Sequence, residues 1–355
     1  MKRLFVTEIP ELVRMGRTAE SEDGTSLSVF WTASGIELRL GASDLFVELE
    51  SIYGSLELWI DVMIDGELSQ KIQLPHGRSR IPVFQGLDPS RVRTVRILRD
   101  TQAMAQDGDA SVLLFHAIET DDHAMFERIP EPALRLEVIG DSITSGEGAG
   151  LERQVEWAPV VFSAVNSYGY LAAELLNAQV NILSSSGWGL YASWDANTEC
   201  ALPPYYHEVC GLAKGAGNEA AGAKRPWDFA AWRPDVIVIN LGTNDSGAIN
   251  NQNRWTREEY HPLFNNAAVS FLRDLRAQNP EARLLWAYGM LGNDMAEWIR
   301  EAIADYMRET GDERVSFFAF TDCDAAHLGV RSHPNRRAHK EAAEALAEEI
   351  RRLMR

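Results

Sequence analysis

The sequence predicts two domains, an antiparallel β-sandwich over residues 1–128 and an α/β domain with a parallel sheet over residues 133–355. At 355 residues the chain exceeds the ~100–200 residues of a typical single domain. Its first part alternates apolar and polar residues in short runs, which is the period of half-buried strands. Its second part alternates strand-like apolar runs with segments of helical spacing, which is typical of a parallel sheet.

The first part contains short alternating runs at the spacing expected of an antiparallel sandwich. These runs are residues 28–31, 36–40, 45–49, 58–62, 80–84, 95–98 and 112–115. Each of the two sheets would bury one face against the other. Residues 121–132 are polar and end in Ile-Pro-Glu-Pro, and because proline interrupts helices and strands, we expect this segment to be the linker.

The second part predicts five strands with helices between them. The expected strands are residues 134–139, 180–183, 235–240, 283–287 and 315–320. The expected helices are residues 167–176, 262–276, 295–310 and 339–353. The run at 235–240 is almost entirely apolar, as expected of a central strand buried on both faces. Strands that alternate with helices predict right-handed crossovers in one parallel sheet.

Charge and composition exclude several classes of function. The formal net charge of −18 argues against nucleic acid, whose phosphates require clustered Lys and Arg, and against anionic membrane surfaces. No apolar run is long enough for a signal peptide or a membrane span, so we expect a cytoplasmic protein. Cys200, Cys210 and Cys323 are expected to be reduced thiols. The common metal-binding spacings are absent, so a metal is not expected.

Three short motifs follow three of the predicted parallel strands, where ligands bind in open parallel sheets. Ser142 lies in Gly-Asp-Ser after the first strand, and glycines there let the backbone turn sharply and expose the hydroxyl. Gly187 lies in Ser-Ser-Gly-Trp-Gly after the second strand and could direct its N–H into a site, although this motif alone is more typical of an ordinary turn. Asn244 lies in Gly-Thr-Asn-Asp after the third, where its amide could stabilise an oxyanion or merely cap a turn.

His333 is the candidate general base for Ser142. It lies in Arg-Ser-His-Pro-Asn just before the last predicted helix, where the proline restricts the loop and Asn335 can start the helix. An imidazole within reach of a serine hydroxyl can take its proton and activate it as a nucleophile. The remaining histidines are expected to be structural or exposed, with His339 near the start of the last helix.

Ser, Gly, Asn and His in this order resemble the four blocks of the SGNH (GDSL-like) hydrolase family over residues 134–355. The whole chain is more specifically similar to carbohydrate esterase family 2, in which a jelly-roll-like sandwich precedes the SGNH domain. Asn-Ser-Tyr at 166–168, Pro-Pro-Tyr-Tyr at 203–206 and Tyr-Gly-Met at 288–290 add to this likeness. The resemblance implies a flavodoxin-like α/β/α architecture for the second domain.

The resemblance also implies a function. It indicates a serine esterase that removes O-acetyl groups from carbohydrates, such as acetylated xylo- or manno-oligosaccharides, through an acetyl-enzyme and without a cofactor. Ser142 would be the nucleophile and His333 the base. The backbone N–H groups of Ser142 and Gly187 and the amide of Asn244 would bind the oxyanion.

The sequence departs from the wider family pattern at one position. Val330 stands three residues before His333, where SGNH enzymes usually carry Asp. Members of carbohydrate esterase family 2 use a Ser–His dyad in which a backbone carbonyl orients the histidine, and we hypothesise the same here. Asp322 and Asp324 are the rival orienting residues, because their loop leads to His333.

Aromatic residues between the motifs are candidates for binding the apolar faces of a sugar. They include Trp188, Tyr191 and Trp194, with packing in the core as the alternative role. Two other functions stay open: a lipase or thioesterase of the same superfamily, and a non-catalytic carbohydrate-binding protein. The sequence does not specify the sugar backbone, the acetyl position, the role of the sandwich or whether the chain forms a homo-oligomer.

Overall fold

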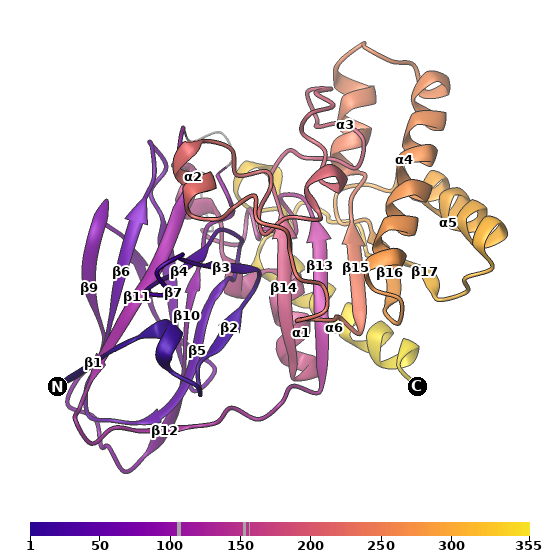
Figure 1. Ribbon diagram of the computed structural model, residues 1–355. Coiled ribbons are helices and arrows are strands. Elements are labelled where there is room, and N and C mark those ends of the chain that lie inside the picture. The colour runs from indigo at the N-terminus through magenta and orange to yellow at the C-terminus, as the bar shows by residue number, and fades with distance from the viewer. Residues whose placement is uncertain (105–107, 152–153, 156) are drawn as a thin grey trace. The chain divides into compact units, whose positions relative to one another are not determined.

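The structure is a computed structural model that describes residues 1–104, 108–151, 154–155 and 157–355. The chain divides into two compact units (Figure 1). One contains residues 1–131 and 206–227, and the other contains residues 132–205 and 228–355. The segment 206–227 therefore groups with the N-terminal residues, although the predicted boundary assigns it to the α/β domain.

The first unit is a sandwich of two six-stranded antiparallel sheets. In strand order, one sheet contains β3 (Thr18–Glu20), β4 (Leu27–Val29), β11 (Val112–Thr120), β6 (Leu45–Ile52) and β9 (Gly77–Phe84), with β1 (Lys2–Phe5) paired to β11. The other contains β12 (Met125–Glu127), β5 (Gly35–Gly41), β10 (Val92–Arg99), β7 (Trp59–Ile64) and β8 (Glu67–Gln73), with β2 (Val13–Met15) paired to β5. Alternate residues such as Leu45, Val47 and Leu49 fill the core between the sheets.

All the alternating runs predicted in the sandwich overlap strands, although the run 28–31 extends two residues beyond β4 and the run 58–62 starts one residue before β7. Strands β1, β2, β3, β8 and β12 were not predicted from the sequence. Four of these are only three or four residues long, and β8 buries neither face, so none shows a clear apolar alternation. Part of the expected linker is thus a strand, because β12 pairs with β5.

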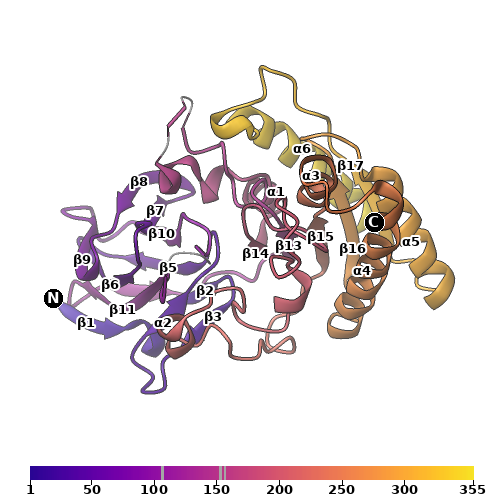
Figure 2. The same cartoon turned by 90° about the horizontal axis from the view of Figure 1, so that it is seen from above.

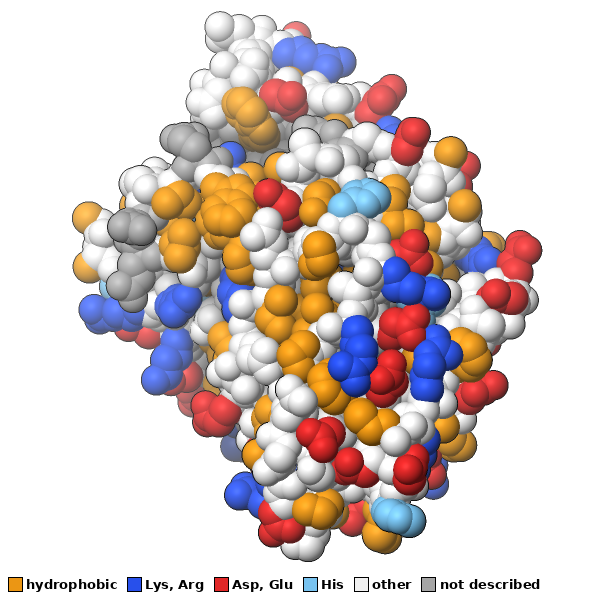
Figure 3. All heavy atoms as spheres, turned by 90° about the vertical axis from the view of Figure 1, so that its left-hand side faces the viewer, with side chains coloured by type: hydrophobic (Ala, Val, Ile, Leu, Met, Phe, Trp, Pro, Cys, Tyr) orange, Lys and Arg blue, Asp and Glu red, His pale blue; other side chains and the backbone are white. Residues whose placement is uncertain are grey.

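The outer surface of the sandwich carries ion pairs between strands. Arg3 on β1 lies 2.7 Å from Glu48 on β6, and Arg80 on β9 lies 2.9 Å from Glu119 on β11. Figure 3 shows acidic and basic side chains next to one another on the face that it draws. Exposed pairs of this kind each contribute about 1 kcal/mol or less, so this surface owes its stability mainly to the core beneath it.

Arg17 fixes both ends of the segment 206–227 within the first unit. Its buried guanidinium donates hydrogen bonds to the carbonyl oxygens of Tyr206 and Glu208, the latter at 3.1 Å. The same group lies 4.6 Å from the ring centre of Tyr206 and 5.2 Å from that of Trp227. Because a buried cation needs several partners, Arg17 explains why a segment from the middle of the chain folds with its N-terminal part. Helix α2 (Ala216–Ala220) lies in this segment.

The second unit contains a five-stranded parallel sheet. Its strands are β13 (Leu134–Gly140), β14 (Ala178–Ser184), β15 (Val236–Asn240), β16 (Arg283–Tyr288) and β17 (Val315–Ala319). Their order across the sheet is β14-β13-β15-β16-β17, which is the flavodoxin-like order 2-1-3-4-5 when the strands are counted from β13. The predicted parallel sheet is confirmed, and each predicted strand is present within about two residues of its expected ends.

Helices cover both faces of this sheet (Figure 2). They are α1 (Tyr168–Leu176), α3 (Thr243–Asn251), α4 (Arg257–Gln278), α5 (Ala296–Thr310) and α6 (Arg336–Leu353). Figure 2 shows α1 and α6 on one side of the sheet and α4 and α5 on the other. Asn335 caps α6 by accepting a hydrogen bond from the N–H of Ala338, as expected from its position after His-Pro. Among the helices of the described residues, none has the length and apolar character required to cross a membrane.

Candidate active site

Ser142 lies in a buried turn that follows β13 at the carboxyl edge of the parallel sheet. Gly140 ends the strand and has no room for a side chain, because a Cβ atom there would lie 2.9 Å from the carbonyl oxygen of Asn240 in β15. Backbone hydrogen bonds within the turn hold its shape. The N–H of Ser145 donates to the carbonyl oxygen of Asp141 at 3.0 Å, and the N–H of Glu147 donates to the carbonyl oxygen of Ser142 at 3.0 Å. The Gly-Asp-Ser motif therefore fixes the position of the hydroxyl locally.

The structure brings Ser142 and His333 together from opposite ends of the α/β unit. His333 Nε2 lies 2.8 Å from Ser142 Oγ, and His333 Nδ1 lies 2.9 Å from the carbonyl oxygen of Arg331. A carbonyl can only accept, so the Nδ1 atom carries the proton and Nε2 is free to accept the proton of the serine hydroxyl. Ser142 is mostly buried, with 7% of its surface exposed.

The carbonyl that orients His333 belongs to a residue in an unusual conformation. Arg331 has φ 56° and ψ 30°, and Ser332 has φ 58°, so two consecutive non-glycine residues are left-handed. Such residues cost roughly 1–3 kcal/mol each and persist only when neighbouring groups hold them. The side chain of Gln154 does so in part, since it accepts from the N–H of Arg331 at 3.0 Å and donates to the carbonyl of Gly329 at 3.1 Å.

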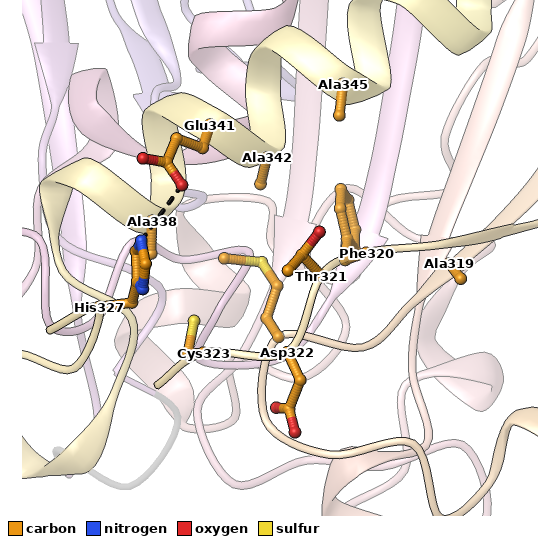
Figure 4. Close-up of a pocket in the computed structure, with 11 residues that line it drawn as sticks. Ala319, Phe320, Thr321, Asp322, Cys323, His327, Ala338, Glu341, Ala342 and Ala345 are labelled. Atoms are coloured by element: carbon orange, nitrogen blue, oxygen red, sulfur yellow. Dashed lines mark ion pairs between the residues drawn. The ribbon is translucent and has the colours of Figure 1, made fainter. Parts of the chain in front are cut away.

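The rival orienting residues both bind elsewhere. Asp324 Oδ1 lies 2.7 Å from His327 Nδ1, and Asp322 Oδ1 accepts from the N–H of Gly292 at 2.9 Å. Figure 4 shows His327 and Glu341 joined by an ion pair on the wall of a pocket beneath α6. This pocket is lined by the end of β17, the loop that follows it and α6, and neither member of the Ser–His pair lines it. The geometry therefore favours a dyad oriented by a backbone carbonyl.

Two backbone N–H groups are available to bind an oxyanion. Within the described residues, the N–H groups of Ser142 and Gly187 donate no hydrogen bond. Gly187 has φ +80°, a conformation that glycine adopts readily.

The amide of Asn244 is already engaged in the structure. Its Nδ2 donates to the carbonyl oxygen of Trp188 at 2.8 Å and to Asp141 Oδ2 at 3.2 Å. Because an amide nitrogen has two protons, donation to an oxyanion requires Asn244 to share or release the longer bond, the one to Asp141.

Asp141 and Asp245 organise the loops around the site. Asp245 accepts hydrogen bonds from the N–H groups of Leu190 and Tyr191, each at 2.8 Å, and from the hydroxyl of Tyr260 at 2.9 Å. Burial raises the pKa of Asp245, and these donors oppose the rise by stabilising the carboxylate. Burial also raises the pKa of Asp141, to about 7. Both acids accept hydrogen bonds from backbone N–H or side-chain amide groups of the loops, which is a scaffolding role.

The three candidate sugar-binding aromatics differ in exposure. Trp188 is only 5% exposed and packs edge-on against Tyr205, with ring centres 5.4 Å apart, so it offers little surface for stacking on a sugar. Tyr191 packs against Tyr260 with ring centres 5.6 Å apart. Trp194 is 53% exposed, and its backbone N–H donates to the carbonyl of Gly187 at 3.1 Å. The interpretation of Trp188 as a sugar platform is thus not favoured, and Trp194 offers the largest free surface.

Glu147 is the residue of this site that the sequence analysis missed. It is 3% exposed, its Oε1 lies 2.8 Å from Arg331 Nη1, and its Oε2 lies 3.8 Å from His333 Nε2. Its Oε2 also accepts a hydrogen bond from Ser186 Oγ. The one signal for it in the sequence is an acidic residue inside the Gly-rich turn that carries the serine.

The described residues contain no cluster of three or more His, Cys, Asp or Glu side chains arranged to hold a metal ion. Cys200, Cys210 and Cys323 are free thiols. Burial raises the pKa of Cys323 to about 11, which keeps that thiol protonated at neutral pH.

Comparisons with known proteins agree with both units. Residues 138–341 match the GDSL-like lipase/acylhydrolase family, and residues 14–130 match the carbohydrate esterase 2 N-terminal domain. The chain is 28% identical to an acetylxylan esterase / glucomannan deacetylase of Cellvibrio japonicus, with 97% of this chain and 89% of that protein covered.

Solved structures of similar proteins cover the same span. An acetyl xylan esterase from the rumen bacterium Butyrivibrio proteoclasticus is 33% identical, with a TM-score of 0.94 and coverage of 100% of this chain and 99% of that one. A family two carbohydrate esterase from Clostridium thermocellum, in complex with cellohexaose, is 22% identical, with a TM-score of 0.81 over 97% of this chain and 99% of the other. The second similarity supports the fold.

Proposed function

This chain belongs to the GDSL-like lipase/acylhydrolase family, and we propose that it is a serine esterase that removes O-acetyl groups from carbohydrates. The similar proteins that cover nearly its whole length are described as acetylxylan esterases, one of them also as a glucomannan deacetylase. Acetylated xylo- and manno-oligosaccharides are therefore the substrates to test first. These sugars are neutral, which suits a protein with a net charge of −18.

The observation that carries this proposal is the 2.8 Å separation of Ser142 Oγ and His333 Nε2, with the other imidazole nitrogen held by a carbonyl. In the first step, Ser142 Oγ bonds to the acetyl carbonyl carbon while its proton passes to His333 Nε2. The bond from that carbon to the sugar oxygen then breaks, and the imidazolium gives the proton to this leaving oxygen, which becomes the sugar hydroxyl. Water activated by the same imidazole attacks the acetyl-enzyme, releases acetate and restores Ser142.

The oxyanion of each tetrahedral intermediate accepts hydrogen bonds from the free N–H groups of Ser142 and Gly187. The side-chain amide of Asn244 is the third donor. Loss of one such donor typically costs about 2.7–4 kcal/mol in the transition state. Asn244→Ala should therefore lower kcat about a hundredfold or more. Unchanged kcat, measured on an acetyl ester with the fold verified by circular dichroism, would show that the two backbone groups suffice.

The direct test measures acetate release from acetylated xylan and acetylated glucomannan by the wild-type protein and by Ser142→Ala. We expect acetate from the wild type and a loss on the order of 10⁴-fold or more in the variant. Rates on acetyl and octanoyl esters of one alcohol test the lipase or thioesterase alternative, which requires the longer chain to react faster. A wild-type protein that binds these glycans without releasing acetate would instead indicate a non-catalytic binding protein.

A further inference from the structure

We propose that Glu147 is a positioning residue for the general base, because through Arg331 it holds the backbone carbonyl that orients His333. This inference rests on the proposed function, since it concerns the same Ser–His site. The sequence lacks the acid that the wider family places three residues before the histidine, and Val330 occupies that position. The structure supplies a buried acid from a different segment, and this acid acts on the base loop (residues 321–335) from outside.

The backbone of Arg331 has an unusual conformation that needs support. Its carbonyl oxygen lies 2.9 Å from His333 Nδ1 while its backbone is left-handed, with φ 56° and ψ 30°. An L-residue rarely adopts this conformation without support, so relaxation to ordinary angles would turn the carbonyl away from the imidazole. The side chain of the same residue provides support, since its guanidinium lies 2.8 Å from Glu147 Oε1.

The two side chains of the Arg331–Glu147 ion pair differ in burial. The Arg331 side chain is 52% exposed, whereas the Glu147 carboxylate is almost fully buried. A buried carboxylate is unfavourable unless cations and hydrogen-bond donors compensate for its lost hydration. Arg331 and the hydroxyl of Ser186 are the partners that do so. The buried Glu147 carboxylate is therefore a fixed acceptor for the Arg331 guanidinium. This side-chain contact restrains the backbone of Arg331.

Glu147 contacts three of the segments that carry the proposed chemistry. Its backbone N–H donates to the carbonyl of Ser142 at 3.0 Å, its Oε2 accepts from Ser186 next to Gly187, and its Oε1 pairs with Arg331 in the base loop. One residue thus sets the spacing of the nucleophile, an oxyanion donor and the base.

Glu147 also lies close enough to His333 to stabilise a positive charge on the imidazole. Its Oε2 is 3.8 Å from His333 Nε2, too far for a hydrogen bond but within range of a strong Coulomb interaction in a buried site. The imidazole becomes positive only after it accepts the serine proton, so a nearby carboxylate favours that step over substrate binding. Removal of the charge should therefore change kcat more than KM.

The experiment uses the full-length protein and an acetylated substrate. Glu147→Gln preserves the shape of the side chain and removes its charge, and we expect kcat to fall about 10- to 100-fold with KM within about threefold of wild type, because a misplacement of about 1 Å can cost 10²-fold. Arg331→Met should lower kcat in the same way, and Arg331→Lys should recover part of the loss. The double variant should be no slower than the slower single variant, since both changes remove one interaction.

A matched control breaks an exposed pair far from this chemistry. Arg273→Met removes the contact with Glu309, 2.6 Å long between α4 and α5, and should leave kcat unchanged. Wild-type kcat in Glu147→Gln, or losses that multiply in the double variant, would overturn the positioning role. If Glu147→Gln does not fold, the half-exposed Arg331→Met decides the matter, and wild-type kcat there also overturns it. Absence of acetate release by the wild-type protein would contradict the proposed function itself, which is a different result.

Discussion

The turn that carries Ser142 and the loop that carries His333 are joined by the Ser142–His333 hydrogen bond and by the Glu147–Arg331 ion pair, yet they are held in place in different ways. Residues 140–148 are buried throughout, and backbone hydrogen bonds within the turn hold its shape. Residues 321–335 are mostly exposed or half-buried and include two left-handed residues. Side chains from outside that loop hold it, such as Gln154 and, from the nucleophile turn itself, Glu147.

The difference teaches that the two halves of a catalytic pair can differ in how far they depend on local sequence. The nucleophile turn needs glycines at close approaches and little else, so a short motif encodes it. The base loop needs partners that lie far away in the sequence, so its motif, His-Pro, marks the position of the imidazole without fixing its orientation. Substitutions in the two regions should therefore fail for different reasons, and three further predictions test this.

The largest effect is expected where the two regions touch. Gly148 has φ +89°, and a Cβ atom there would lie 2.8 Å from the Cβ of His333 and 2.6 Å from the carbonyl oxygen of Pro334. Gly148→Ala should push the base loop away and lower kcat about 10²-fold or more. Kinetics on an acetyl ester test this. A fully active Gly148→Ala protein would mean that the base loop moves more freely than its contacts suggest.

A smaller effect, on stability, is expected in the first turn of α6, which follows the base loop. His339 lies in the first turn of α6, and its Nδ1 accepts from the N–H of Tyr168 at 3.1 Å. Burial lowers the pKa of His339 from 6.5 to about 4. Between pH 6.5 and about 4, His339 binds a proton in the unfolded chain but not in the folded chain. The contribution of His339 to the free energy of unfolding is therefore complete above pH 6.5 and is lost as the pH falls towards 4.

His339→Asn keeps a hydrogen-bond acceptor and removes this titration. The difference in unfolding free energy between wild type and variant should be largest above pH 6.5. It should be smaller at pH 4, by an amount on the order of 3 kcal/mol. Denaturant unfolding at a series of pH values measures it. A gap that stays constant with pH would show that His339 is not held neutral by burial.

The smallest effect is expected at Asp324. This exposed carboxylate binds His327, and that contact lowers the pKa of Asp324. Because it does not contact His333, Asp324→Ala should change kcat by less than about threefold, compared with the ~10⁴-fold loss seen when a triad acid is removed. A loss of that larger size would restore Asp324 as the orienting acid and reject the role of the Arg331 carbonyl.

Much of the fold followed from periodicity. The alternating runs of the sandwich and the five parallel strands were predicted because burial on one or both faces imposes a regular pattern on the residues themselves. Short or exposed strands such as β8 carry no such pattern and were missed. Helix α3 was missed for a related reason, since Thr243–Asn251 is polar and starts directly at the Gly-Thr-Asn-Asp motif, which is equally typical of a turn.

The sequence by itself determined the order of the two architectures, the identities of Ser142, Gly187, Asn244 and His333 as candidates, and the absence of an acid at position 330. Tertiary structure alone decided that the Arg331 carbonyl faces the imidazole, that Glu147 pairs with Arg331, that Trp188 is buried, and that residues 206–227 fold with the sandwich. The physical reason is the range of the interactions: strand periods and tight turns depend on neighbouring residues, whereas an ion pair between residues 147 and 331 forms only after the sheet has brought its loops to one edge.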